Sequence, residues 1–237
     1  MKALQQQVVW VTGAGGAIGS AICERLYTLG AHVVACGRNP DNLPMARPRL
    51  ERLQLDVTDA QAVDAAAKWI IDRWGRIDSL VTCTTLPRFG DFLTLSDDDW
   101  RDVLESKWLG SMRPARAALP SMIQQGSGAI VFISGRGGTV PPPRHLPGAC
   151  ANAALNLLAQ GLATEYGRSG IRVNALAPGP ITSPRLEIMA NGIAKTASAL
   201  GTTGTADNVA DAVAFLLSPQ ASHVTGICLP VDGGRAA

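Results

Sequence analysis

A glycine-rich turn at Thr12–Gly19, with the sequence TGAGGAIG, places the strongest single constraint on the fold of this chain. It directly follows the apolar run Val8–Thr12 and opens a helix-like segment at Ala17–Leu29. Glycines between a strand and a helix let the backbone turn tightly and approach a pyrophosphate, and the start of the helix adds free N–H groups and a positive dipole. A glycine run alone is a weak signal, but this one has the context that phosphate binding requires. We therefore expect a nucleotide site at this turn.

Short apolar runs alternate with helix-length segments along the rest of the chain. The expected strands are Val8–Thr12, His32–Cys36, Leu53–Asp56, Leu80–Cys83, Ala129–Ser134, Ile171–Leu176 and Ile227–Val231. The expected helices are Ala17–Leu29, Ala60–Trp74, Asp97–Ala118, Ala149–Tyr166 and Asp207–Leu217. Strands that are apolar on both faces predict a parallel sheet covered by helices on each side, a doubly wound α/β fold of the Rossmann type with about seven strands. Since no repeat or linker divides the chain, we expect one domain over residues 1–237.

Glycine and proline positions predict where helices end. Gly30, Gly75 and Gly167 stand just after three of the expected helices, where a left-handed residue is readily accommodated. Pro114 and Pro120 fall within the third expected helix and predict that it is kinked or ends early.

The composition excludes several classes of function. A formal net charge of +2 gives no basic field for nucleic acid, and an aromatic content of 5% is too low for base-stacking platforms. The five cysteines are far apart and form no CxxC, which indicates reduced, mostly buried thiols rather than disulfides or a zinc site. The first apolar run is too short for a signal peptide, and no stretch approaches a membrane span. We expect a soluble cytoplasmic protein with a small-molecule substrate and no membrane or nucleic-acid partner.

Four motifs, in family order, resemble those of the short-chain dehydrogenases/reductases. They are the TGAGGAIG turn, the LDV of Leu55–Val57, the IRVNALAPGPI of Ile171–Ile181 and the VDGG of Val231–Gly234. The resemblance covers nearly the whole chain and implies a Rossmann fold, a nicotinamide cofactor and oxidoreductase activity. One departure is Ala17, which stands where the second family glycine would be; alanine is tolerable there if its φ is negative.

The resemblance also implies the cofactor contacts, which are Gly13, Gly15, Ala17, Ile18 and Gly19 around the diphosphate, Asp56 and Val57 at the adenine, and Pro178, Gly179, Ile181, Thr182 and Ser183 toward the nicotinamide and diphosphate. Gly37 stands where a member that prefers NAD usually has an acidic residue for the ribose hydroxyls. Arg38 follows, and its guanidinium could pair with a 2′-phosphate. We therefore expect NADP(H) rather than NAD(H). The alternative is that Arg38 is simply an exposed residue in a turn.

The usual catalytic residues of the family are missing. In the family a Tyr gives or takes the proton, a Lys four residues later lowers the pKa of that Tyr, a Ser orients the carbonyl, and an Asn on the preceding long helix holds a water. The resemblance places Gly148, Asn152, Gly135 and Lys107 at these four positions, in that order. The NNAG segment of the family is replaced by Thr82–Thr85. The chain thus resembles a divergent member without the Ser-Tyr-Lys set.

Several residues are candidates for the missing chemistry. The family has Asn on the long helix and Lys on the next helix, whereas here Lys107 is on the long helix and Asn152 on the next one. An ammonium and an amide would therefore lie on opposite walls of one pocket. The alternative is a lysine that extends to solvent. His145, in a proline-rich loop, is a substitute acid or simply a solvated side chain. Ser134 retains a hydroxyl, and Arg136 is either a carboxylate or phosphate ligand or a surface residue. Both Cys83 and Cys150 are interpreted as buried thiols near this pocket.

Three functions remain open from the sequence. The favoured one is an NADP(H)-dependent oxidoreductase that acts on a carbonyl or alcohol, with Lys107, or a water held by Lys107 and Asn152, supplying the proton. The others are a non-redox isomerase, cyclase or lyase that uses the ammonium to stabilise an enolate or alkoxide, and a nucleotide-binding subunit that pairs with an active relative. Ser183–Gly204 is expected to form an apolar lid over the substrate.

We also expect a homodimer or homotetramer. One helix carries a face of small residues, Ala149, Ala151, Ala153 and Ala154, that allows close packing. The carboxyl-terminal segment with Thr225-Gly226 and Val231–Gly234 resembles the tetramer contact of the family.

Overall fold

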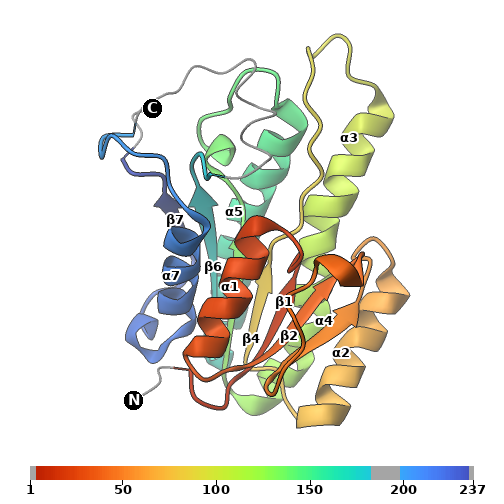
Figure 1. Ribbon diagram of the computed structural model, residues 1–237, viewed down its shortest axis with the longest axis vertical. Helices are drawn as coiled ribbons and strands as arrows, with labels where there is room; N and C mark the ends of the chain where they lie inside the picture. Colours follow the sequence, from red (N-terminus) through yellow and green to blue (C-terminus); the bar gives the residue numbers. More distant parts are fainter. Residues whose placement is uncertain (1–3, 183–197, 235–237) are drawn as a thin grey trace.

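The computed structural model describes residues 4–182 and 198–234, and in these ranges it shows one parallel sheet of seven strands in the order β3-β2-β1-β4-β5-β6-β7 (Figure 1). The strands are β1 Val8–Thr12, β2 His32–Gly37, β3 Leu50–Gln54, β4 Ser79–Thr82, β5 Gly128–Ile133, β6 Ile171–Pro178 and β7 Cys228–Val231. The helices are α1 Ala17–Thr28, α2 Ala60–Trp74, α3 Asp97–Val103, α4 Gly110–Gln125, α5 Leu146–Tyr166 and α7 Ala206–Leu217. This architecture confirms the doubly wound α/β fold.

Helices cover both faces of the sheet. Helices α1 and α7 pack on one face, and α2, α4 and α5 pack on the other (Figure 1). Successive residues of a strand point to opposite faces, so Val9 and Val11 of β1 pack with α1 and α7, whereas Val8 and Trp10 pack with the opposite layer. A strand buried on both sides must be apolar at every position, which is why the continuous apolar runs predicted this sheet.

The third long helix was expected to be kinked or to end early, and the early end was wrong. Helix α3 continues through the π-helical segment Leu104–Leu109 into α4, which contains Pro114 and Pro120 and ends only at Gln125. The wide turn changes the helical register before the prolines, and such turns are frequent at functional sites. Lys107 lies within it.

Other helix and strand ends also differ from the expectation. Gly30 and Gly75 do adopt positive φ values, 98° and 73°. Gly167 has a φ of −58° because a 3-10 turn follows α5, and Gly170 takes the left-handed position instead. Strand β3 begins and ends earlier than expected, which leaves Asp56 in the turn after it. Helix α5 begins at Leu146, so His145 is its N-cap residue rather than part of a free loop.

The carboxyl ends of the strands bring the candidate site residues together. Strands β1 and β4 are neighbours, and the connection after β1 runs to β2 on one side whereas the connection after β4 runs to β5 on the other. Ligands of such sheets bind in the crevice between two connections that diverge in this way. The glycine turn follows β1, Cys83 follows β4, Ser134 follows β5 and Gly179 follows β6. These segments all lie at the upper end of the sheet in Figure 1. Within the described ranges, no helix is both long and apolar enough to cross a membrane.

Candidate active site

The glycine turn packs too tightly for side chains at two positions. Gly13 has a φ of 71°, and a Cβ on it would lie 2.4 Å from the carbonyl oxygen of Cys83. A Cβ on Gly19 would lie 2.2 Å from the carbonyl oxygen of Gly13. The turn therefore requires glycine at both positions. Ala17 is not among the residues with positive φ, so alanine is accommodated there without strain.

The amino terminus of α1 is open to a ligand. Its N-cap residue Gly16 has no side chain to accept a hydrogen bond, and residues 15–17 are exposed. The first hydrogen bond of the helix runs from Ser20 N–H to the Gly16 carbonyl, at 2.8 Å. The N–H groups of Ala17, Ile18 and Gly19 precede it and have no acceptor within the helix. Such a helix start suits a phosphate group, and the tight glycine cradle beside it fits a dinucleotide.

The end of β2 carries the two residues, Gly37 and Arg38, that are expected to lie next to the ribose of the cofactor. A Cβ on Gly37 would lie 3.0 Å from Cδ2 of Leu43 and 3.8 Å from the Gly15 nitrogen, so a longer acidic side chain at this position would be crowded. Arg38 is exposed, and its backbone carbonyl accepts a hydrogen bond of 3.1 Å from Gln54 Nε2. The backbone of Arg38 is thus anchored to β3, and the residue is exposed directly after Gly37.

The other expected cofactor contacts lie on short, well-fixed segments. Oδ1 of Asp56 accepts hydrogen bonds from the backbone N–H and the hydroxyl of Thr58, at 3.0 and 2.8 Å. Val57 is buried, and its Cγ2 would be 2.6 Å from a Cβ on Gly110. After β6, Gly179 donates to the Val231 carbonyl at 3.0 Å.

The segment after Gly179 is described as far as Thr182. Ile181 is buried, and Thr182 N–H donates to the Gly204 carbonyl at 2.9 Å. Ser183 and most of the expected lid lie outside the described residues.

Lys107 is buried rather than extended to solvent. It is 6% exposed, and its Nζ donates to the backbone carbonyls of Ile133 and Ser134, at 3.2 and 3.1 Å. An ammonium that leaves water needs such acceptors, and carbonyl oxygens at the end of a strand provide them. The ammonium of Lys107 therefore holds the carboxyl end of β5 in place.

Asn152 reaches the same end of β5 from α5. A Cβ on Gly135 would lie 2.8 Å from Asn152 Nδ2, so the amide occupies the space that a serine side chain at position 135 would need. Asn152 is 5% exposed, and its Oδ1 is buried without a hydrogen-bond donor among the described residues. A buried acceptor of this kind is suited to a water molecule or a substrate hydroxyl. The structure thus brings Lys107 and Asn152 to the same two-residue segment, Ser134-Gly135.

Two further candidates already have polar partners. The hydroxyl of Ser134 donates to the Leu176 carbonyl at 3.2 Å, which directs it toward β6. Nε of Arg136 lies 2.8 Å from Oδ2 of Asp232, and the side chain of Asp232 is only 9% exposed. The hydroxyl of Thr139 accepts a hydrogen bond from Nη1 of Arg136, at 2.8 Å. Arg136 is thus a bridge between the segments that follow β5 and β7.

His145 is the candidate that the structure places most unexpectedly. It is 7% exposed, and its ring lies against Gly148 and the ring of Phe89. Of the two alternatives for His145, the solvated loop side chain was therefore wrong. Cys150, by contrast, is exposed, so the expectation that it is a buried thiol was also wrong, whereas Cys83 is half-buried.

Comparison with known proteins identifies the family. The family model described as enoyl-(acyl carrier protein) reductase matches residues 13–236. The short-chain reductase protein NovJ of Streptomyces niveus is 34% identical, over 98% of this chain and 94% of that protein. The chain belongs to the short-chain dehydrogenase/reductase family.

Other members of the short-chain dehydrogenase/reductase family support the same assignment. Galactitol 2-dehydrogenase (L-tagatose-forming) of Cereibacter sphaeroides is 35% identical over 94% of this chain and 92% of that protein. The structure of a gluconate 5-dehydrogenase from Burkholderia cenocepacia in complex with NADP and tartrate has a TM-score of 0.90 and 27% identity, over 98% of this chain and 96% of that one. The similarity therefore extends over the whole domain in both sequence and fold.

Some partners in this short-chain dehydrogenase/reductase site carried no signal in the sequence. Asp232 belongs to the VDGG motif, but nothing in the sequence pairs it with Arg136. Phe89 and the carbonyl of Arg88, which contact His145, lie in a segment without a motif. These contacts depend on how two loops meet above the sheet.

Proposed function

We propose that this chain is an NADP(H)-dependent oxidoreductase that acts on a carbonyl or alcohol group without the tyrosine and lysine of its family. The observation that carries the proposal is the intact cofactor cradle, in which neither Gly13 nor Gly19 has room for a Cβ beside the open start of α1. Relatives named as reductases and dehydrogenases, one of them solved with NADP, are consistent with it. The bound cofactor supplies or accepts a hydride at its nicotinamide ring.

Different residues of the chain bind different parts of the cofactor in this proposal. The N–H groups at the start of α1 bind the diphosphate, and the guanidinium of Arg38 pairs with the 2′-phosphate. Asp56 contacts the adenine, and the Pro178–Thr182 segment contacts the nicotinamide amide. Gly37 leaves the ribose without an acidic partner, which favours the phosphorylated cofactor.

Lys107 and Asn152 position the reacting group in this proposal. Two of the three N–H bonds of the Lys107 ammonium are directed to the carbonyls of Ile133 and Ser134, so the ammonium provides a fixed positive charge next to the substrate. Oδ1 of Asn152 accepts a hydrogen bond from a water or from the substrate hydroxyl. Holding the carbonyl in one orientation contributes to the rate even before any proton is transferred.

Two measurements test the proposal. Calorimetric titration with NADPH and NADH tests the cofactor, and NADPH oxidation with a panel of ketones and aldehydes tests the reaction. We expect tighter binding of NADPH and turnover of at least one carbonyl. Binding without any turnover would instead support the nucleotide-binding subunit, and conversion of a substrate with no net oxidation of NADPH would support the isomerase, cyclase or lyase.

A further inference from the structure

The imidazole of His145 occupies the space above Gly148. A Cβ on Gly148 would lie 2.2 Å from Cε1 and 2.3 Å from Nε2 of His145, which are distances that no real pair of such atoms adopts. Position 148 is the one where the family resemblance expects the tyrosine. The volume in which the phenol side chain would begin is therefore filled by an imidazole that comes from the preceding turn.

The loop after β4 fixes the orientation of this ring. Nδ1 of His145 is 3.3 Å from the carbonyl oxygen of Arg88, and because a carbonyl only accepts, Nδ1 carries the hydrogen. Nε2 is then the basic nitrogen of the neutral ring, and it is the one next to Gly148. The ring of Phe89 lies 4.5 Å away, centroid to centroid, at 33°. The N–H of Gly90 donates to the Arg144 carbonyl at 3.0 Å and joins the two loops.

The charged groups on these loops are engaged elsewhere or face water. The guanidinium of Arg88 pairs with Asp99 at 3.2 Å and with Asp102 at 3.3 Å, on α3. Arg144 is exposed. On α5, the position against the ring is Gly148, which carries no charge. The imidazole is thus a buried titratable group whose Nδ1 donates to a fixed carbonyl and whose Nε2 lies at the position where the side chain of residue 148 would begin.

We propose that His145 is the proton donor and acceptor of this site, and that position 148 is glycine because the imidazole needs its space. The proposal rests on the oxidoreductase function above. In the reducing direction, the hydride for the carbonyl carbon would come from a bound NADPH, which would be oxidised to NADP⁺. The carbonyl oxygen takes the proton from Nε2–H of the imidazolium, directly or through one water, so an O–H bond forms and the N–H bond breaks. The ring returns to its neutral form with Nδ1–H still bonded to the Arg88 carbonyl. In the oxidising direction, neutral Nε2 accepts the alcohol proton.

Thermal unfolding tests the packing half of the proposal without any substrate. Gly148→Ala should lower the Tm by on the order of 5 °C, because the new methyl group collides with the ring. The matched control is Gly161→Ala in the same helix, where a Cβ meets nothing within 4 Å; it should leave the Tm unchanged or raise it slightly. In a His145→Ala background, Gly148→Ala should lose most of its effect. An equal Tm for Gly148→Ala and Gly161→Ala in the otherwise native chain would overturn the packing.

Steady-state kinetics test the proton half, with the best carbonyl of the panel. His145→Gln keeps a polar side chain of similar length but cannot exchange a proton, so the rate of NADPH oxidation should fall by roughly 100-fold or more. The affinity for NADPH, measured by calorimetry, should change less than about twofold on the same reasoning. His223→Gln, a change of an exposed histidine far from the site, is the matched control and should keep the native rate.

Chemical rescue separates proton transfer from a structural role. Free imidazole should restore part of the rate of His145→Ala, whereas pyrazole, which has the same size but is a far weaker base, should not. Full activity in His145→Gln, loss of NADPH binding in that variant, or equal rescue by the two heterocycles would each overturn the proton role. A native chain that binds NADPH but reduces no carbonyl would overturn the proposed function and the proton role together. The Tm values of Gly148→Ala in the native and His145→Ala backgrounds would still show whether the imidazole occupies the space above residue 148.

Discussion

Arg38 is the single residue on which the expected cofactor preference depends. It is exposed at the end of β2, and a backbone hydrogen bond from Gln54 holds it there. Arg38→Ala should weaken NADPH binding by about 1.5–3 kcal/mol, the range for hydrogen bonds to charged groups, and should leave NADH binding nearly unchanged. Calorimetric titration of both cofactors checks this. An equal loss for NADPH and NADH would mean that Arg38 does not contact the 2′-phosphate.

Burial of the Cys36 thiol should make stability depend on alkaline pH. Burial raises the pKa of Cys36 from 9.0 to about 12, although the Trp10 indole donates to its Sγ at 3.2 Å and opposes the rise. The folded pKa is above the unfolded one, so the neutral thiol favours the folded state fully below pH 9, and this contribution is lost as the pH rises through 9 to 12. Urea unfolding of the native chain should therefore show a steeper loss of stability in that range than Cys36→Ala. Parallel curves for the two proteins would contradict the prediction.

At the residue scale, the sequence predicted positions better than partners. The steric demands at Gly13 and Gly19 follow from the local strand–turn–helix pattern, so they could be anticipated. The pairing of Arg136 with Asp232 could not, because it joins the ends of two different strands. The exposure of Cys150 also depends on tertiary structure, since it is set by which side of α5 faces the sheet.

The long helix from Asp97 to Gln125 shows what local rules miss at the scale of an element. Proline chemistry predicted a kink or an early end, yet the helix continues through both prolines after a π-helical turn. No local residue pattern predicted that turn, which carries the buried Lys107 and is followed by Gly110, packed against Val57. The start of the same helix was predicted correctly, since Ser96 and the following aspartates form a local cap.

This cap gives a prediction for the stability of the element. The Ser96 hydroxyl accepts from the Asp99 N–H at 3.2 Å, and the Asp99 carboxylate accepts from the Ser96 N–H at 3.0 Å. Ser96→Ala should lower the free energy of unfolding by about 1 kcal/mol. Ser222→Ala, an exposed serine in a turn, is the control and should have little effect. Urea unfolding distinguishes the two, and equal stabilities would show that the cap contributes nothing measurable.

At the scale of the whole molecule, the continuous apolar runs were sufficient to predict the sheet and its two helical layers. The strand order was not predicted, because periodicity carries no information about which strands are neighbours. The site was only partly predictable for the same reason. The glycine turn is local, whereas the meeting of His145 with Gly148 and Phe89 requires two loops to be placed against each other.

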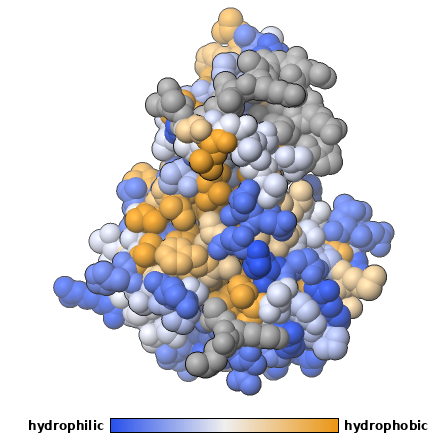
Figure 2. Space-filling model, turned by 60° about the vertical axis from the view of Figure 1, so that its left-hand side comes forward, coloured by the Kyte–Doolittle hydropathy of each residue, from blue (hydrophilic) through white to orange (hydrophobic). Residues whose placement is uncertain are grey.

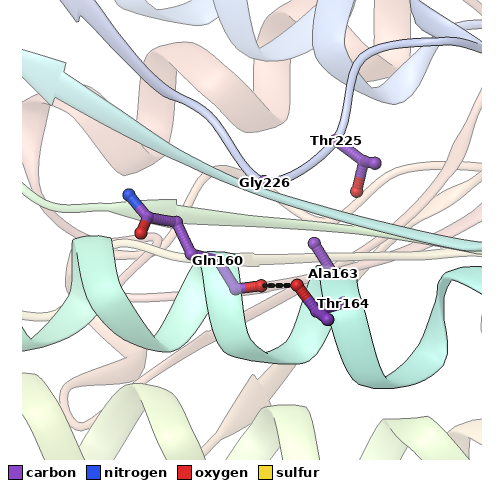
Figure 3. Close-up of a pocket in the computed structure, with 5 residues that line it drawn as sticks. All are labelled: Gln160, Ala163, Thr164, Thr225 and Gly226. Carbon is purple, nitrogen blue, oxygen red and sulfur yellow. Dashed lines mark hydrogen bonds between the residues drawn. The ribbon is translucent and has the colours of Figure 1, made fainter.

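The surface of the molecule has apolar areas suited to self-association. Leu157, on the outer face of α5, is 70% exposed. On the side that carries β7 and α7, Figure 2 shows apolar side chains gathered among polar ones, and Phe215 and Ile227 are exposed. An open hollow between the second half of α5 and the segment before β7 is lined by Gln160, Ala163, Thr164, Thr225 and Gly226 (Figure 3). It includes the Thr225-Gly226 segment that was expected at a tetramer contact, and it lies many residues along α5 from Gly148.

We predict a homodimer or homotetramer in solution. Light scattering at micromolar concentration should give at least twice the mass of one chain. Leu157→Glu places a charge on the outer face of α5 and should reduce that mass, because an unpaired buried charge opposes association. Leu93→Glu, at an 89% exposed leucine in the loop before α3, is the control and should leave the mass unchanged. A native chain with the mass of a monomer would contradict the prediction.

The contact between His145 and Gly148 also limits the substitutions by which this chain can change. Replacing Gly148 by tyrosine alone would force the phenol into the imidazole, so even together with Asn152→Lys it would not rebuild the family site. Residue 145 has to become small first, and on the proton role proposed here that first step removes the existing acid. Every single-substitution route back to tyrosine would then pass through an inactive or destabilised intermediate. Under selection for activity, the order in which these substitutions have to occur would therefore keep His145 and Gly148 as they are.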